Sequence, residues 1–95
     1  MKFPAIENEI LGITEEQFKP HLKAESKRAL ELFQEEIIRE IYFKKEQHNT
    51  VLILECKDKV QDENILQTLS LVKENLISFE VSQLIPYNGF SRLIP

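Results

Sequence analysis

The chain has 95 residues, of which 42% are hydrophobic and 29% charged, and its formal net charge is -4 at pH 7. This length favours a single domain, residues 1–95, which buries little surface and gains by forming a dimer. The acidic balance, without a basic stripe interleaved with aromatics, argues against a nucleic-acid partner. No apolar run approaches the ~20 residues that span a bilayer, and MKFPAIENEI lacks the apolar region of a signal peptide. The lone Cys56 cannot form an internal disulfide or a thiolate metal cluster, and so we expect a cytoplasmic protein without membrane contacts.

The first element is predicted to be a strand over residues 2–10, interrupted by Gly12. Pro4 lacks a backbone donor, so this strand should lie at the sheet edge or be paired on one side only at Pro4. Thr14 and Gln17 read as a capping box at a helix start. Pro20 comes too late for the first turn, and either a short turn precedes the main helix or Pro20 bends one continuous helix.

The main helix, which we expect to end near Glu36, carries the most informative pattern in the chain. At 3.6 residues per turn, an apolar stripe runs along one side of FKPHLKAESKRALELF. The stripe contains Phe18, Leu22, Ala29 and Phe33, with Leu32 at its edge. Glu25 lies in the middle of this stripe, and His21 lies on the same flank one turn earlier. A carboxylate aimed at a core is costly to bury unless it is paired, hydrogen-bonded or protonated. Glu25 therefore either reaches water or an arginine, or it faces a pocket.

The spacing changes from 3.6 to 2 at Ile37, which predicts strands. In IIREIYFKKE, one face carries Ile37, Arg39, Ile41 and Phe43, and the other carries Ile38, Glu40, Tyr42 and Lys44. A polar turn at residues 47–49 joins this strand to TVLILEC (50–56), which predicts an antiparallel hairpin. Both strands are apolar on both faces, so both faces of the sheet should be covered.

The rest of the chain adds a helix and a strand. The helix is expected from about Gln61 or Asp62, buries Ile65, Leu66 and Leu69, and ends within residues 70–72. LISFEVSQLIP (76–86) is the last strand, with Ile77, Phe79 and Val81 on one face. The tail YNGFSRLIP (87–95) is apolar enough that we expect it to pack on the domain or on a partner.

The resulting order, β-α-β-β-α-β, predicts an α+β, ferredoxin-like fold with a four-stranded antiparallel sheet and two helices on one face. The helices cover one apolar face of the sheet. The second face needs a second subunit, and the simplest arrangement packs two sheets face to face in a dimeric α+β barrel.

The chain resembles the muconolactone isomerase-like family of dimeric α+β barrel proteins over residues 18–94. The segments HLKAESKRALELFQEEIIREIYF, VLILEC and LQTLSLVKENLISFEVSQLIPYNGF carry this resemblance, with Ser70 where the family usually has Pro. The resemblance implies a homodimer or larger ring, and proton movement in a small unsaturated lactone without a metal or organic cofactor. It places Lys23 at the lysine of the isomerase LKA segment and Glu25 at the acidic residue two places on. The histidine-bearing strand of the true isomerase becomes IIREIYF here, and His48 aligns only with a one-residue gap.

The candidate site residues are Glu25, His21 and Lys23 for catalysis, and Arg39 and Tyr42 for substrate binding. Four residues apart on a helix, His21 could hydrogen-bond Glu25 as a general acid-base couple. Arg39 is either the structural partner of Glu25 or an anion clamp for a carboxylated substrate, and Tyr42 is a hydrogen-bond donor.

Three other sequence features do not indicate a functional site. His21 and Glu25 lack a third ligand with recognisable spacing, so no metal is expected. Cys56 has no activating partner and is read as a core residue, and the glycines form no nucleotide-binding motif.

Two functions fit these patterns. The first is a cofactor-free isomerase of the muconolactone isomerase type, which shifts a proton in a small organic lactone or related acid. The second is a non-catalytic module of the same fold that binds a small ligand or only dimerises. An enzyme should bring two or more titratable groups to one apolar cavity, whereas a module should show that cavity filled by side chains.

Overall fold

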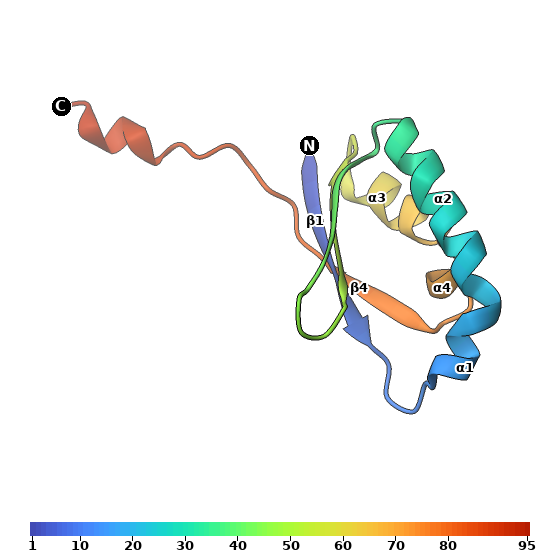
Figure 1. Ribbon diagram of the computed structural model, residues 1–95. Coiled ribbons are helices and arrows are strands. Elements are labelled where there is room, and N and C mark those ends of the chain that lie inside the picture. The colour runs from blue at the N-terminus through green and yellow to red at the C-terminus, as the bar shows by residue number, and fades with distance from the viewer.

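The computed structural model describes residues 1–95 as an α+β fold with one four-stranded antiparallel sheet. The strands lie in the order β2-β3-β1-β4 across the sheet. Helices lie on one side of it (Figure 1), an arrangement compatible with the expected ferredoxin-like plan. The elements are β1 (Lys2–Glu9), α1 (Glu15–Phe18), the 3-10 turn η1 (Lys19–His21), α2 (Leu22–Gln34), β2 (Ile38–Phe43), β3 (Thr50–Glu55), α3 (Lys59–Leu66), α4 (Ser70–Lys73), β4 (Ile77–Val81) and the 3-10 turn η2 (Gly89–Leu93).

The core lies between the sheet and the helices, because one side of each strand is apolar and faces them. Alternate residues of the two central strands are almost fully buried, namely Phe3 and Ala5 of β1 and Leu52 and Leu54 of β3. From the helical layer Leu32 is completely buried, together with apolar residues of α3, α4 and the segments that follow them. The predicted faces of the last strand are confirmed: Ile77, Phe79 and Val81 pack toward the core, while Ser78, Glu80 and Ser82 are exposed.

β1 is an internal strand, and the ladders pair Pro4 on one side only, which is the second of the two arrangements predicted for it. Pro4 pairs with Ile53 of β3, whereas the ladder with β4 begins one residue later, at Ala5 opposite Val81. Pro4 still accepts a hydrogen bond from Ser82 N–H at 3.2 Å. An internal position is tolerated because the missing donor falls where the ladder with β4 starts.

A short turn that contains Pro20 precedes the main helix, which is the first of the two arrangements predicted for this proline. Gln17 Oε1 accepts the Thr14 backbone N–H at 2.8 Å, as expected of a capping box. Pro20 lies in η1, between α1 and α2. The buried side of α2 is rotated relative to the predicted stripe, because Leu32 is fully buried while Leu22 and Phe33 are about half exposed.

The two helices α2 and α4 are each followed by a non-glycine residue in the left-handed region of backbone conformation. Glu36 has φ 64°, and Ile37 N–H donates to Leu32 O at 2.9 Å. Asn75 has φ 59°, and Leu76 N–H donates to Leu71 O at the same distance. These are Schellman motifs, which stop α2 and α4 without a glycine and explain the abrupt switch to strand spacing.

A β-bulge in β2 overturns the predicted assignment of its two faces. Ile38 pairs with Leu54 and Ile41 with Leu52, and the register shifts between Ile38 and Glu40. One extra residue, Arg39, therefore lies between two inward-facing isoleucines. Apolar residues occupy both alternating sets of positions in IIREIYF. Strict alternation therefore predicted that Ile38 lies on the face opposite Ile41 and Phe43.

The predicted second helix is two short helices. Asp58 accepts the Gln61 backbone N–H at 2.8 Å and starts α3 at Lys59, earlier than expected. Leu69 is extended, with ψ 132°, and it separates α3 from α4. Residues 70–72 therefore begin a helix rather than end one. The buried positions Leu66 and Leu69 are as predicted.

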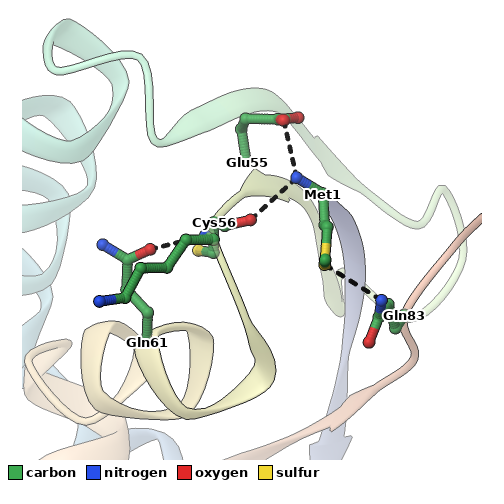
Figure 2. A network of polar contacts seen from close by, with 6 residues as sticks. Met1, Glu55, Cys56, Gln61 and Gln83 are labelled. Atoms are coloured by element: carbon green, nitrogen blue, oxygen red, sulfur yellow. Dashed lines mark hydrogen bonds and ion pairs between the residues drawn. The ribbon is translucent and has the colours of Figure 1, made fainter.

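The start of β1 is tied to the end of β3 by a polar network (Figure 2). The Met1 amino group donates to Glu55 Oε1 at 3.0 Å and to Cys56 O at 2.9 Å. Gln83 Nε2 lies 3.1 Å from Met1 Sδ, which brings the chain beyond β4 to the same place. An isolated bridge between Lys2 and Leu84 continues this contact.

The C-terminal tail does not pack on its own domain. It leaves the sheet after β4 and extends away from it (Figure 1). The large apolar side chains of residues 87–95 are 69–80% exposed, namely Tyr87, Phe90, Leu93 and Ile94. Of the two expected packing sites, the tail's own domain is therefore not the one used, and packing on a partner stays a prediction. No helix in the structure is long and apolar enough to cross a membrane.

Candidate functional site

A cavity of about 320 Å³ opens between α2 and the inner face of the sheet. Its volume lies at the lower end of the range for small-molecule sites. The lining is mostly apolar and includes three aromatic residues. It consists of Glu25, Ser26, Ala29, Ile38, Ile41, Tyr42, Phe43, Thr50, Leu52, Leu69 and Phe79.

Glu25 is the only carboxylate in this lining. α2 positions it on the side that faces the sheet, on the same side of the helix as Ala29 and Leu32. Its Oε1 accepts the backbone N–H of Leu71 at 3.1 Å. This hydrogen bond links α2 to α4 and orients the carboxylate at the cavity wall.

Burial raises the pKa of Glu25 above its ordinary value. The backbone N–H groups of Leu71 and Ser70 oppose this rise, and the negative charge of Glu7 adds to it. The pKa remains raised on balance. A carboxyl group of this kind exchanges protons closer to neutral pH than a surface glutamate does, as general acid-base chemistry requires.

Glu7 is a second acidic residue next to the cavity, and the sequence reading missed it. It lies on the helix-facing side of β1, two residues after the buried Ala5, and pairs across the ladder with Phe79. Its Oε1 accepts the Thr50 backbone N–H at 3.2 Å. Phe79 and Thr50 both line the cavity. The alternation of Phe3, Ala5 and Glu7 was the signal that could have found this residue.

Tyr42 lines the cavity, but its hydroxyl group does not face Glu25. The Tyr42 hydroxyl donates to Glu40 Oε1 at 2.7 Å, and this hydrogen bond raises the pKa of Tyr42. Glu40 and Tyr42 pair with Ile53 and Val51 on the face of the sheet that the helices leave open. Two other residues of the lining, Ser26 and Thr50, also carry hydroxyl groups.

The other three predicted site residues do not line the cavity. Lys23 is exposed on α2, and His21 is half-buried in η1 without a hydrogen bond to Glu25. Arg39 is exposed at the β2 bulge. Its positive charge makes a small contribution to lowering the pKa of Glu55, after the larger effect of the Met1 amino group. The structure thus brings together Glu25 and Tyr42 of the five predicted residues, and it forms neither the His21–Glu25 couple nor the Arg39–Glu25 pair.

Two buried groups lie outside the cavity, near the end of β3. Cys56 is 4% exposed, and burial raises its thiol pKa to about 11, which fits the predicted core role. Asp62 is completely buried on α3, and neither carboxylate oxygen has a hydrogen-bond partner. Burial raises the pKa of Asp62 to about 6. No cluster of three or more His, Cys, Asp or Glu side chains is arranged to hold a metal ion.

Comparison with known proteins adds no family assignment: no protein-family model matches the chain, and a search of curated proteins finds no match.

Proposed function

We propose that this chain is a cofactor-free isomerase or related lyase of the muconolactone isomerase type, acting on a small, partly apolar molecule in the cavity between α2 and the sheet. The observation that carries this proposal is Glu25, a single half-buried carboxylate in a mostly apolar cavity, with a raised pKa. Such a group is matched to proton transfer near neutral pH.

In this mechanism Glu25 takes a proton from the carbon next to a substrate carbonyl. The bond electrons move into the carbonyl and give an enolate, and the same carboxyl returns the proton to a different carbon of the conjugated system. No atom is gained or lost, and so no oxidant or cofactor is needed. Ser26 and Thr50 line the cavity, and their hydroxyl groups are the donors that this mechanism assigns to the enolate oxygen.

Deuterium incorporation tests this proposal. We would incubate the protein in D₂O with a set of small unsaturated lactones and follow loss of the exchangeable C–H signal by proton NMR. Wild type should accelerate exchange for at least one lactone, and Glu25→Gln should remove at least 99% of that rate. Glu31→Gln is the matched control, because Glu31 lies on the same helix but outside the cavity. Equal rates in wild type and Glu25→Gln would overturn the catalytic assignment.

The second candidate is a non-catalytic ligand-binding or dimerisation module. The Glu25–Leu71 hydrogen bond favours it, since a carboxylate that joins two helices has a structural role without any chemistry. In that case the lactones would bind without deuterium exchange.

We also propose that the protein works as a homodimer, pairing as a dimeric α+β barrel in a reducing cytoplasm. The open face of the sheet carries Pro4, Val51 and Ile53, which are half-buried, and Ile6, which is 36% exposed. The tail of each chain carries exposed apolar groups that its own domain does not cover. A second copy would bury both surfaces at once.

A further inference from the structure

The resemblance implies either a neutral lactone or an organic acid as the ligand. The charges around the α2 cavity distinguish these two classes. The lining contains one carboxylate and no lysine, arginine or histidine. Glu7 adds a second acidic group beside it, held by the Thr50 backbone N–H. An anionic ligand in this cavity would therefore meet negative charge and no fixed cation.

Arg28 and Arg39 lie outside the lining. Arg28 Nε donates to Thr68 Oγ1 at 2.8 Å, and its guanidinium lies 3.7 Å from Glu31 Oε1. Arg39 lies at the β2 bulge and is not part of the lining. Recognition of a carboxylate usually relies on an arginine or on several converging donors, and neither is present in the lining.

We propose that the cavity selects an uncharged, ring-sized apolar molecule with a carbonyl or amide group, and rejects the carboxylate of the same shape. The apolar wall, including Phe43 and Phe79, would hold the ring, and Glu25 with the Ser26 and Thr50 hydroxyls would meet the polar group. The selected class is a neutral lactone, ketone or amide rather than an organic acid. This inference rests on the proposed function only for the location of the site.

A matched series of probes tests the selection by binding alone. Phenylacetamide, phenylacetate and 2-phenylethylamine share one ring and a similar length, and they are neutral, anionic and cationic at pH 7.5. Each would be titrated into the full-length ¹⁵N-labelled protein while the Leu71 and Thr50 amide resonances are followed. Phenylacetamide should bind at least tenfold more tightly than phenylacetate. It should also bind more tightly than 2-phenylethylamine, because an ammonium group would lose its hydration in a mostly apolar lining whose one carboxylate already accepts a hydrogen bond from Leu71 N–H.

Substitutions then assign the selection to the acidic groups. Glu25→Gln and Glu7→Gln should each reduce the preference for phenylacetamide over phenylacetate at least threefold, while Glu31→Gln should leave it unchanged. Circular dichroism of each variant verifies the fold. The proposal is overturned if phenylacetate binds as well as the amide, if the amine binds best, or if none of the three probes shifts these resonances.

The outcome is independent of catalysis. If the neutral probe binds best but no lactone exchanges deuterium, the ligand preference is supported and the proposed isomerase activity is refuted. If a lactone acid exchanges deuterium and phenylacetate binds tightly, the isomerase activity is supported and the ligand preference is refuted.

Discussion

At the residue scale, Glu25 combines a structural hydrogen bond with a position suited to chemistry, and substitution can separate the two roles. Glu25→Gln keeps an oxygen that can accept from Leu71 N–H. We expect its free energy of unfolding to stay within about 1 kcal/mol of wild type. Glu25→Ala loses the acceptor and should cost about 1–2 kcal/mol. Urea denaturation measures both values.

The double change Glu25→Gln with Arg39→Met provides a control on this geometry. The structure forms no contact between the two side chains, so their effects should add within about 0.5 kcal/mol. A loss of several kcal/mol in either single variant that the double variant restores would indicate a buried ion pair. The cavity assignment of Glu25 would then be wrong.

Asp62 gives a pH dependence whose sign follows from its environment. Its pKa is about 6 in the folded chain against 3.8 for an unperturbed aspartate, so the folded state binds the proton more tightly. This contribution to stability is fully present below about pH 4 and is lost as the pH rises to about 6, in total up to about 3 kcal/mol. Unfolding free energies measured by urea between pH 4 and pH 7 should show this fall.

Asp62→Asn should flatten that profile because the amide does not ionise. Asp58→Asn is the matched control: asparagine is also a good N-cap, and Asp58 is exposed. An unchanged pH profile in Asp62→Asn would show that other groups set the dependence.

At the scale of the elements, the two helix stops without glycine are sites of backbone strain. A left-handed conformation costs a non-glycine residue about 1–2 kcal/mol, and glycine recovers this at an entropic cost of about 0.4–1 kcal/mol. Glu36→Gly should therefore raise the unfolding free energy by about 0.5–1 kcal/mol in urea denaturation. Asn75→Gly should gain less, because asparagine tolerates this conformation better. Destabilisation by Glu36→Gly would contradict the Schellman geometry.

The sequence predicts which face of a strand is buried only when apolar residues occupy one of its two alternating sets of positions. Ile77, Phe79 and Val81 alternate with polar residues, and their faces were assigned correctly. IIREIYF is apolar in both phases, so no pattern could reveal the bulge at Arg39. In ILQTLSLV the apolar residues keep their helical spacing across the break at Leu69. The sequence therefore predicted one helix where the structure has two, α3 and α4. The cavity residue Glu25 was identifiable because it interrupts an apolar stripe, whereas Glu7 belongs to a strand whose ladder was unknown.

At the scale of the whole molecule, the tail dominates the shape. The radius of gyration is 15.5 Å and the longest dimension is 60 Å. A compact chain of this length would have a radius of gyration of about 12 Å. The tail nevertheless has local order: residues 89–93 form η2, and the Tyr87 ring meets the ring of Phe90 in η2 edge to face, with centroids 5.0 Å apart. An ordered, apolar, detached segment is suited to packing on another chain.

We expect a chain that ends at Pro86 to keep the domain fold and to associate more weakly than the full chain. Sedimentation velocity across micromolar concentrations should show a dimer for the full chain and a shift toward monomer, at least tenfold in dissociation constant, for the shortened one. Ser91→Ala, within the same tail, is the control and should behave as wild type. A full chain that stays monomeric at high micromolar concentration would refute the dimer.

The bulge at Arg39 also has an evolutionary consequence. Because Arg39 is the extra residue of the bulge, removing it would restore regular alternation and leave Ile38, Ile41 and Phe43 on the side that faces the helices. A three-nucleotide deletion of this codon would thus leave the cavity wall in place. A lineage could gain or lose this residue without changing which side chains meet the ligand.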